Sequence, residues 1–263
     1  MGIKILATAS VGTLFLASQA LGAAWTQPTG NVQIITQYTY SEATEAFDDE
    51  GERTQDADFY KNELSVLIEY GALDYLTAYI KPHFQIVDIN GVEEGGHAFT
   101  DLGLRLRLVN EDTHVFSVQG QVTLPGDIDG TQDVTLASNE FEAEIRALLG
   151  HSFTMNSIPA FWDLQGAYRY REGFQPNEYH LDATFGWQPT EGVEVLLQSF
   201  NTWAEGAGED PMTYPYFRQH KIQGSLVFNA TEAMSLQLGG FYTWAGQNVI
   251  AEEGVIASAW FRF

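Results

Sequence analysis

Apolar and polar residues alternate with a period of two along most of this sequence, in segments of about ten residues. In the segment YKNELSVLIEY, Leu64 and Ile68 share one face, whereas Lys61 and Glu63 share the other. This period predicts β-strands, because successive side chains of a strand point to opposite sides of the sheet. Strands with one apolar and one charged face, long enough for a tilted span of the bilayer, are typical of transmembrane β-barrels.

Twelve segments carry this pattern, and we predict an all-β fold: a transmembrane antiparallel up-and-down β-barrel of about twelve strands. The number is even, as in bacterial outer-membrane barrels whose two ends both lie on the periplasmic side. The predicted strands cover residues 31–40, 58–70, 75–89, 98–109, 114–125, 138–150, 159–171, 178–188, 193–203, 215–228, 233–245 and 254–263.

The predicted connections alternate between short and long, which is the pattern of periplasmic turns and external loops. The short ones, such as NATE and QPTEG, are rich in turn-forming residues. The connection at residues 151–158 is irregular, because it is longer than a periplasmic turn is expected to be. The long connections cover residues 41–57, 90–97, 126–137, 172–177, 204–214 and 246–253.

The N-terminus has a different pattern, in which one cation, Lys4, precedes a short apolar run and then a group of small residues. This order is typical of a secretory signal peptide, and the apolar run is too short to anchor the chain in a membrane. Cleavage after Ala20, Gly22 or Ala24 is compatible with the small residues of this region. The predicted division of the chain is a signal peptide over residues 1–24 and a barrel over residues 25–263.

The chain has a formal net charge of -23 and no cysteine. The acidity argues against nucleic-acid binding, because phosphates would be repelled, and the missing cysteine excludes disulfides and thiolate chemistry. Most of the cations lie on the face predicted to line the lumen, as a membrane barrel requires, since a cation at the lipid midplane costs about 2–4 kcal/mol. These cations are Lys61, Lys81, Arg105, Arg107, Arg146, Arg169, Arg171, Lys221 and Arg262.

A soluble β-sandwich would show the same alternation, with its polar face in water and its apolar face against a second sheet. That alternative does not explain the aromatic residues at predicted strand ends, such as Tyr70, Trp203 and Trp244. Aromatic residues at these positions are typical of the girdles of a membrane barrel.

Charged residues of both signs crowd the predicted lumen, and opposite charges on adjacent strands can pair laterally. One interpretation is a channel lining whose charges decide which solute passes. The alternative is an interior network of ion pairs that fills and stiffens the barrel. The candidate channel-lining residues are Lys61, Glu63, Lys81, His83, Arg105, Arg107, Glu142, Glu144, Arg146, Asp163, Arg169, Arg171, His180 and Asp182.

The predicted external loops are strongly acidic, and one of them places Asp127, Asp129 and Asp133 around Gly130. This spacing is reminiscent of a calcium-binding turn, but the full twelve-residue EF-hand loop with its terminal glutamate is missing. A solvated loop explains the pattern better. We therefore predict no cofactor and no metal centre, with these three aspartates as weak candidates.

Enzymatic barrels are an alternative, because a family of twelve-stranded outer-membrane phospholipases uses Ser, His and Asn on the outer wall. Pairing of residues 193–203 with residues 215–228 places Ser199 beside His220, with Asn201 nearby, on the lipid side. The close His-x-Ser spacing of that family is absent, and a one-residue change of register would turn all three side chains inward. We predict that the protein is not an enzyme.

Strand and turn motifs recur between residues 58 and 203, in NELSVLIEYGALDYLTAYIKPHFQ, FTDLGLRLRLVNEDTHVFSVQGQVTLPG, YRYREGF and HLDATFGWQPTEGVEVLLQ. Together they resemble the transporter-type barrels of the MetA-pathway of phenol degradation family. The return strand IKPHF departs from the PY-like end that is more frequent in that family. The resemblance implies an outer-membrane channel for hydrophobic or aromatic compounds, and it brings no catalytic residues.

The last predicted strand ends on Phe263, with Phe261 on the same face and with Trp260 and Arg262 on the other. A terminal phenylalanine after alternating apolar residues resembles the signal that the barrel-assembly machinery of the outer membrane reads. We predict an outer-membrane channel for passive uptake of small molecules. A structural or assembly-partner barrel with a plugged lumen and a lipid-processing enzyme are the alternatives. The predicted partners are outer-membrane lipid and lipopolysaccharide, the barrel-assembly machinery through Phe263, and a small-molecule solute.

Overall fold

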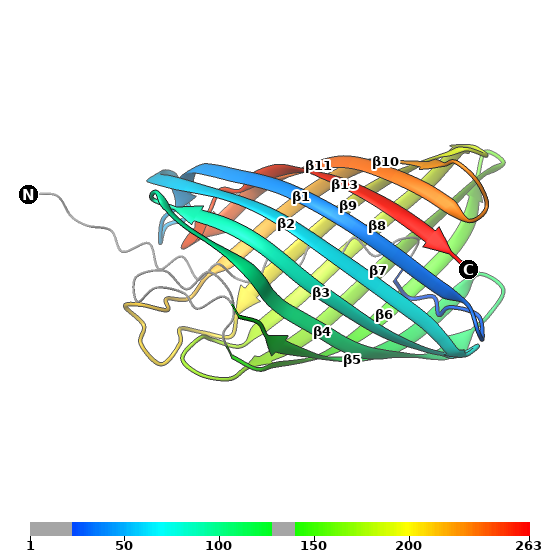
Figure 1. Cartoon of the computed structure of the whole chain (residues 1–263), viewed down its shortest axis with the longest axis horizontal. Coiled ribbons are helices and arrows are strands. Elements are labelled where there is room, and N and C mark those ends of the chain that lie inside the picture. Colours follow the sequence, from blue (N-terminus) through cyan, green and yellow to red (C-terminus); the bar gives the residue numbers. More distant parts are fainter. Residues whose placement is uncertain (1–22, 128–139) are drawn as a thin grey trace, which may run out of the picture.

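The computed structural model describes residues 23–127 and 140–263, and it shows a closed antiparallel β-barrel (Figure 1). The prediction of an all-β, twelve-stranded, up-and-down barrel is confirmed, with one additional two-residue strand, β12. No helix in the described parts of the chain is long and apolar enough to cross a membrane. The strands are β1 (Val32–Phe47), β2 (Arg53–Leu73), β3 (Leu76–Ile89), β4 (Val92–Asn110), β5 (His114–Pro125), β6 (Glu142–Met155), β7 (Ile158–Arg171), β8 (Glu178–Thr190), β9 (Val193–Ala204), β10 (Arg218–Asn229), β11 (Met234–Gln247), β12 (Val249–Ile250) and β13 (Glu253–Arg262).

The barrel closes between its first and last strands, because β1 pairs with both β2 and β13. At the seam, the N–H of Val32 donates to the carbonyl of Phe263 at 3.1 Å, and the N–H of Phe263 donates to the carbonyl of Val32 at 2.9 Å. The C-terminus lies at the end of the barrel that carries the short turns (Figure 1). Because the barrel is closed, none of the long strands has a free edge. A sheet that spans lipid must be closed in this way, since a free edge would leave backbone N–H and C=O groups without hydrogen-bond partners.

Side-chain exposure separates the two faces of the wall. Leu104, Ile145 and Leu238 on the outer face are 55, 65 and 67 % exposed, whereas Lys61 and Trp260 on the inner face are 2 and 0 % exposed. A continuous apolar outer surface of this kind would favour aggregation in water, and it fits the lipid-facing band of a membrane barrel.

The predicted loop at residues 90–97 is wrong, because the chain turns at Asn90 and Gly91 and β4 begins directly afterwards. Both residues have positive φ angles, 55° and 80°, as a type I′ hairpin turn requires. The dipeptide Asn-Gly was the available sequence signal for this turn. The residues that follow the turn at the start of β4 include glycines and acidic residues, which are depleted in strands. The sequence pattern therefore did not predict a strand there.

The irregular connection predicted at residues 151–158 is also wrong, because it is a two-residue turn between β6 and β7. Asn156 and Ser157 have φ angles of 51° and 66°, so this turn is again left-handed at both central residues. Serine rarely adopts this conformation, so little in the local sequence pointed to the turn. This connection is therefore short, like the other turns at the same end of the barrel.

The predicted loop at residues 41–57 is mostly strand, because β1 and β2 both continue beyond the expected ends. Their hairpin turns at residues 48–52, where Asp48 accepts hydrogen bonds from the N–H groups of Glu50 and Glu52 at 3.0 and 2.9 Å. The first hairpin therefore protrudes from the end of the barrel opposite the short turns (Figure 1).

Candidate functional site: the filled lumen

The structure places the predicted channel-lining residues on the inner face of the wall, where ion pairs join most of them into two networks. Lys81, Arg107 and His180 are only half-buried. The remaining residues of the predicted set are buried: Lys61, Glu63, His83, Arg105, Glu142, Glu144, Arg146, Asp163, Arg169, Arg171 and Asp182.

The first network joins β6, β7 and β8. The register places Glu144 directly opposite Arg169 and Glu142 opposite Arg171, so residues two apart on each strand form a ladder of opposite charges. Arg169 contacts Glu144 at 2.7 Å, and Arg171 contacts Glu142 at 3.0 Å and Glu178 at 2.6 Å. Charged hydrogen bonds of this length are stronger than neutral ones.

Arg146 extends this network along β6. It contacts Glu144 at 2.8 Å and Asp182 at 2.6 Å, and it donates to the side-chain oxygen of Gln165 at 2.8 Å. The amide of Gln165 in turn donates to Asp163 at 2.6 Å. The network therefore continues from a paired guanidinium to the Asp163 carboxylate through a neutral side chain.

The second network joins β2, β3 and β4 to the carboxylate of Glu252, which lies between β12 and β13. The ammonium of Lys61 lies 3.7 Å from the carboxylates of both Glu63 and Glu252. His83 continues the chain, with Nδ1 at 3.0 Å from Glu63 and Nε2 at 3.3 Å from Asp101. Because all these groups are buried, each charge depends on its neighbours for compensation.

Apolar side chains fill the lumen toward the end with the short turns. Side chains that faced a water-filled bore would be exposed, but the buried members of this layer expose at most 8 % of their surface. Seven strands on both sides of the barrel contribute to it. The layer consists of Ile35, Leu67, Tyr79, Leu196, Val227 and Trp260, with Phe161 packed against it.

The chain before β1 closes the end of the lumen that carries the short turns. The N–H of Ala24 donates to Asp163 at 2.8 Å, and its carbonyl accepts from Ser117 at 2.5 Å. Arg105 donates to the carbonyl of Trp25 at 3.0 Å. We call residues 23–31 the N-terminal segment.

Two glycines of the wall make room for this segment. A Cβ on Gly150 would lie 2.4 Å from the indole of Trp25, and one on Gly71 would lie 1.9 Å from the carbonyl oxygen of Pro28. Contacts this short are not tolerated, so the wall and the N-terminal segment fit each other only because these positions carry no side chain. The segment is therefore an integral part of the closed lumen.

The opposite mouth is closed by residues 248–252, which we call the mouth loop. These residues fold inward between β11 and β13, and β12 within them pairs with the end of β1. Val249, Ile250 and Ala251 are buried, the first and last with Phe47 and Phe217, and the second with Phe59 and Phe99. The mouth loop therefore plugs the mouth with apolar side chains.

A buried carboxylate anchors the mouth loop to the wall. Glu252 forms a short ion pair with Lys221 on β10 and a second ion pair, at 3.7 Å, with Lys61 on β2. The N–H and the hydroxyl of Thr243 both donate to the carbonyl of Glu252, at 2.8 and 3.0 Å. Sequence reasoning missed Glu252, because residues 246–253 read as one more acidic external loop.

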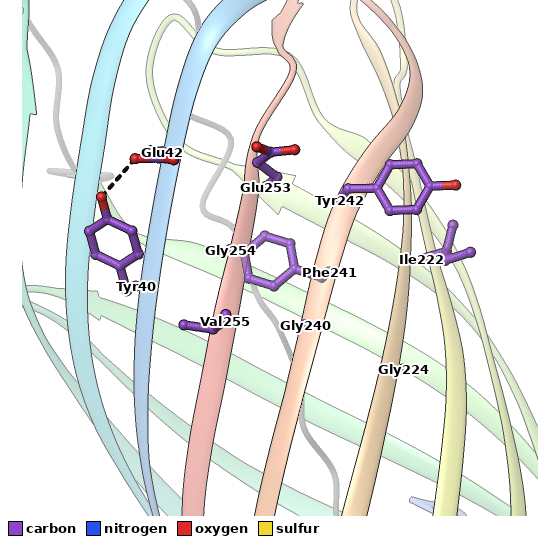
Figure 2. A pocket seen from close by; sticks show the side chains of 10 residues that line it. All are labelled: Tyr40, Glu42, Ile222, Gly224, Gly240, Phe241, Tyr242, Glu253, Gly254 and Val255. Atoms are coloured by element: carbon purple, nitrogen blue, oxygen red, sulfur yellow. Dashed lines mark hydrogen bonds between the residues drawn. The ribbon is translucent and has the colours of Figure 1, made fainter.

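The outer wall carries a groove of about 520 Å³ where β10, β11, β13 and β1 meet (Figure 2). Gly224 and Gly240 lie opposite each other in the register and leave the outer face there without side chains. Phe241 is buried on the inner side, and a Cβ on Gly254 would lie 2.8 Å from its ring. The groove therefore faces the lipid, with the Phe241 ring separating it from the lumen.

The residues of the enzymatic alternative do come close together on the outer wall, but the register places Asn201 opposite His220 and Ser199 opposite Ile222, so Ser199 is not directly beside His220 as predicted. Nδ1 of His220 lies 2.9 Å from the side-chain oxygen of Asn201, and the amide nitrogen of Asn201 donates to Ser199 at 3.1 Å. The amide therefore stands between the hydroxyl and the imidazole. A general base must instead contact the nucleophile directly, so this arrangement does not activate the serine.

Of the weak metal candidates, Asp129 and Asp133 lie outside the described residues. Asp127 is described, and its N–H donates to the carbonyl of His97 at 2.8 Å. Residues 23–127 and 140–263 contain no group of three His, Asp or Glu side chains with the geometry to hold a metal ion.

Two exposed carboxylates on the long-loop side are held in the ionised form. A hydrogen bond from Thr54, supported by the N–H of Glu52, lowers the pKa of Asp48 below its ordinary value. Hydrogen bonds from Asn177, Tyr168 and Tyr179 lower the pKa of Glu205 in the same way. Because a lowered pKa extends the charged form to lower pH, these two side chains of the rim keep their negative charge in more acidic solution than ordinary carboxylates do.

The barrel is similar to solved outer-membrane structures. It matches a COG4313 outer membrane channel from Pseudomonas putida F1 with a TM-score of 0.79 and 15% identity, over 93% of this chain and 99% of that chain. It matches the NanC porin with a TM-score of 0.54 and 8% identity, over 87% and 98% of the chains. The translocator domain of the autotransporter NalP from Neisseria meningitidis matches with a TM-score of 0.50 and 10% identity, over 90% of each chain.

No family model matches the sequence, and neither does any curated protein. The structural matches have low sequence identity, so they establish the fold of an outer-membrane barrel and leave the solute open.

Proposed function

We propose that the protein is a channel of the bacterial outer membrane for passive passage of small molecules, and that the structure represents its closed state. The observation that carries this proposal is which parts of the chain close the two ends of the lumen. Neither the N-terminal segment nor the mouth loop is part of the twelve long strands, because the N-terminal segment precedes β1 and the mouth loop joins the sheet only where β12 pairs with two residues of β1. Hydrogen bonds and buried side chains hold the N-terminal segment, whereas the ion pairs of Glu252 and the apolar side chains of β12 hold the mouth loop. Segments of this kind can move while the wall stays intact.

Two similarities support a channel and suggest its solutes. The COG4313 outer membrane channel shares the fold over nearly its whole length. The strand and turn motifs resemble the MetA-pathway of phenol degradation family, which implies hydrophobic or aromatic solutes. The acidic rim would repel anions at the outer mouth, so the proposal favours neutral or cationic compounds.

Removal of both closures tests this proposal. We expect single-channel recordings of the refolded wild-type protein to show a mostly sealed bilayer with rare openings. A variant that lacks residues 23–29 and 248–252 is expected to conduct steadily, because both closures outside the wall are gone. The matched control lacks the exposed residues 209–212 of the β9–β10 loop, and it is expected to behave as the wild type.

The same recordings discriminate between the channel and a structural barrel with a plugged lumen. Heat-modifiable gel migration first shows that each variant is folded. A folded double-deletion variant that leaves the bilayer sealed under voltage would overturn the channel proposal, because the ion-pair networks and the apolar layer alone would then block the lumen.

The barrel-assembly machinery is a proposed partner, and Phe263 is the proposed contact. Its ring is 73 % exposed on the outer wall, while its backbone makes the two seam hydrogen bonds with Val32. Each such bond contributes about 1 kcal/mol. We expect deletion of Phe263 to lower the amount of barrel in outer-membrane fractions several-fold, while the refolded barrel loses only about 2 kcal/mol of unfolding free energy.

Quantitative immunoblots of membrane fractions and urea unfolding of the refolded protein measure these two effects. The control is Phe263→Tyr, which keeps an aromatic terminal residue and should assemble normally. Normal outer-membrane levels of the deletion variant would contradict the proposed recognition.

A further inference from the structure

Asp163 is a buried carboxylate without a cation beside it. It is 1 % exposed, and its hydrogen bonds come from two neutral groups, the N–H of Ala24 and the amide of Gln165. No ion pair within 4 Å joins it to any cation among the described residues, whereas the other buried acids of this region have arginine partners. Burying a charged carboxylate costs free energy unless a positive charge lies beside it, so we expect Asp163 to have a cationic partner.

The neighbouring cations are already committed to other carboxylates. Arg146 pairs with Glu144 and Asp182, and it reaches Asp163 only through Gln165. Arg105 pairs with Glu69 at 3.1 Å. Across the whole region, four guanidinium groups and one imidazole face six carboxylates: Arg105, Arg146, Arg169, Arg171 and His180 against Glu69, Glu142, Glu144, Glu178, Asp163 and Asp182. Even with His180 protonated, the carboxylates outnumber the cations by one. The region therefore has room for another positive charge.

The N-terminal segment brings main-chain nitrogen to this carboxylate. The nitrogen of Ala24 lies 2.8 Å from Oδ2 of Asp163, and Ala23 is buried beside it with Val115 and Leu148. The peptide nitrogen of Ala23 is one residue upstream of this contact. If the chain began there, that nitrogen would be an ammonium next to the unpaired acid.

The sequence permits a chain that begins at this residue. Cleavage after Gly22 leaves Ala20 and Gly22 as the two small residues that a signal peptidase requires on either side of Leu21. We propose that processing occurs between Gly22 and Ala23, and that the α-ammonium of Ala23 is the counter-ion of Asp163 inside the lumen. The inference rests on export of the protein, which is part of the proposed function.

The step is a hydrolysis of one peptide bond. Water adds across the bond between the carbonyl carbon of Gly22 and the nitrogen of Ala23, leaving a carboxylate on the former and an ammonium on the latter. The other compatible sites fit less well. Cleavage after Ala24 removes the residue that binds Asp163 and Ser117, and cleavage after Ala20 moves the ammonium two residues away.

The pairing ties closure of the lumen to maturation. An unprocessed chain has only a neutral N–H at Asp163, whereas the mature chain has a full charge that locks the N-terminal segment in place. The N-terminal segment is therefore expected to dock firmly only after the leader has been removed.

The first test is intact-mass and N-terminal peptide analysis of the protein purified from outer membranes. We expect the first residue to be Ala23. A mature chain that begins at Leu21 or Trp25 would overturn the assignment.

The second test measures the titration of the α-amine. The protein that begins at Ala23 is refolded and labelled by reductive ¹³C-methylation, and the pKa of its terminal amine is followed by NMR. We expect Asp163→Asn to lower this pKa by about one unit, since loss of a nearby opposite charge disfavours the charged form. The matched control is Asp101→Asn, which removes a buried lumen carboxylate of the other network and should leave the terminal amine unchanged.

A second variant keeps the test valid if Asp163→Asn fails to fold. A Gly-Ser extension before Ala23 retains Asp163 but moves the amine away, and its terminal amine is expected to titrate near the ordinary value of about 8. Equal titration in the extended and unextended proteins would overturn the pairing. A sealed bilayer in the channel experiment would leave these results untouched, so the two proposals fail separately.

Discussion

Replacement of Glu252 by glutamine is expected to release the mouth loop and to make it accessible to external reagents. The neutral amide would leave Lys61 and Lys221 buried without their shared carboxylate, and breaking a buried pair in this way costs about 3–5 kcal/mol. Outward movement of the mouth loop relieves this cost, because water then reaches both ammonium groups. At a factor of ten for each 1.4 kcal/mol, the open population should rise by roughly a hundredfold or more.

The measurement uses the absence of cysteine from the chain. Ile250→Cys introduces one thiol at a buried position of the mouth loop, and a membrane-impermeant maleimide reports how often the loop opens. The matched control is Glu253→Gln in the same cysteine background, because Glu253 is the next residue but is exposed on the outer face. Equal labelling rates in the Glu252→Gln and Glu253→Gln variants would show that the ion pairs do not hold the loop.

Replacement of Arg169 by methionine is expected to cost about 3–5 kcal/mol of unfolding free energy. Arg169 lies among Glu142, Glu144 and Glu178, and its loss leaves these acids with too little positive charge in a buried site. Urea titration of the refolded barrel in lipid vesicles, with tryptophan fluorescence as the signal, measures the loss.

The matched control is Arg53→Met, which removes an arginine–carboxylate pair of similar length at the protruding hairpin. Arg53 lies 2.8 Å from Glu45 with side chains 46 and 48 % exposed, whereas Arg169 lies 2.7 Å from Glu144 with side chains 2 and 3 % exposed. An exposed pair contributes about 0–1 kcal/mol, so the control should stay close to the wild type. Similar losses in both variants would mean that burial does not govern the strength of these pairs.

Part of the candidate site followed directly from the strand pattern. Glu142, Glu144 and Arg146 are two residues apart on β6, so the period of two alone places them on one face. Their partners Arg169 and Arg171 also stand two apart on the next strand. That the two strands are neighbours is predictable, because neighbouring strands in an up-and-down barrel are also neighbours in sequence. The register that aligns these charges depends on the two-residue turn at Asn156 and Ser157, which the sequence pattern did not reveal.

The state of the lumen was not predictable in the same way. The sequence left a channel lining and an ion-pair network equally open, because both place the same charges on the same face. The distances and burial show that these charges pair with one another, as the contacts of Arg169 and of Lys61 illustrate. Such pairing is compatible with a channel lining as well as with a network that only stiffens the barrel. The role of these residues in solute passage stays a prediction.

The sequence by itself determined the barrel: its strands, their two faces, its even strand number and the closing of the last strand on the first. These features depend on the alternation of side chains along each strand and on turns between adjacent strands, which are local properties. Only the tertiary structure decided that the N-terminal segment and the mouth loop fold into the lumen. Both segments turn inward because they contact distant parts of the chain: Ala24 contacts Asp163, and Glu252 contacts Lys61. No local sequence pattern encodes such contacts.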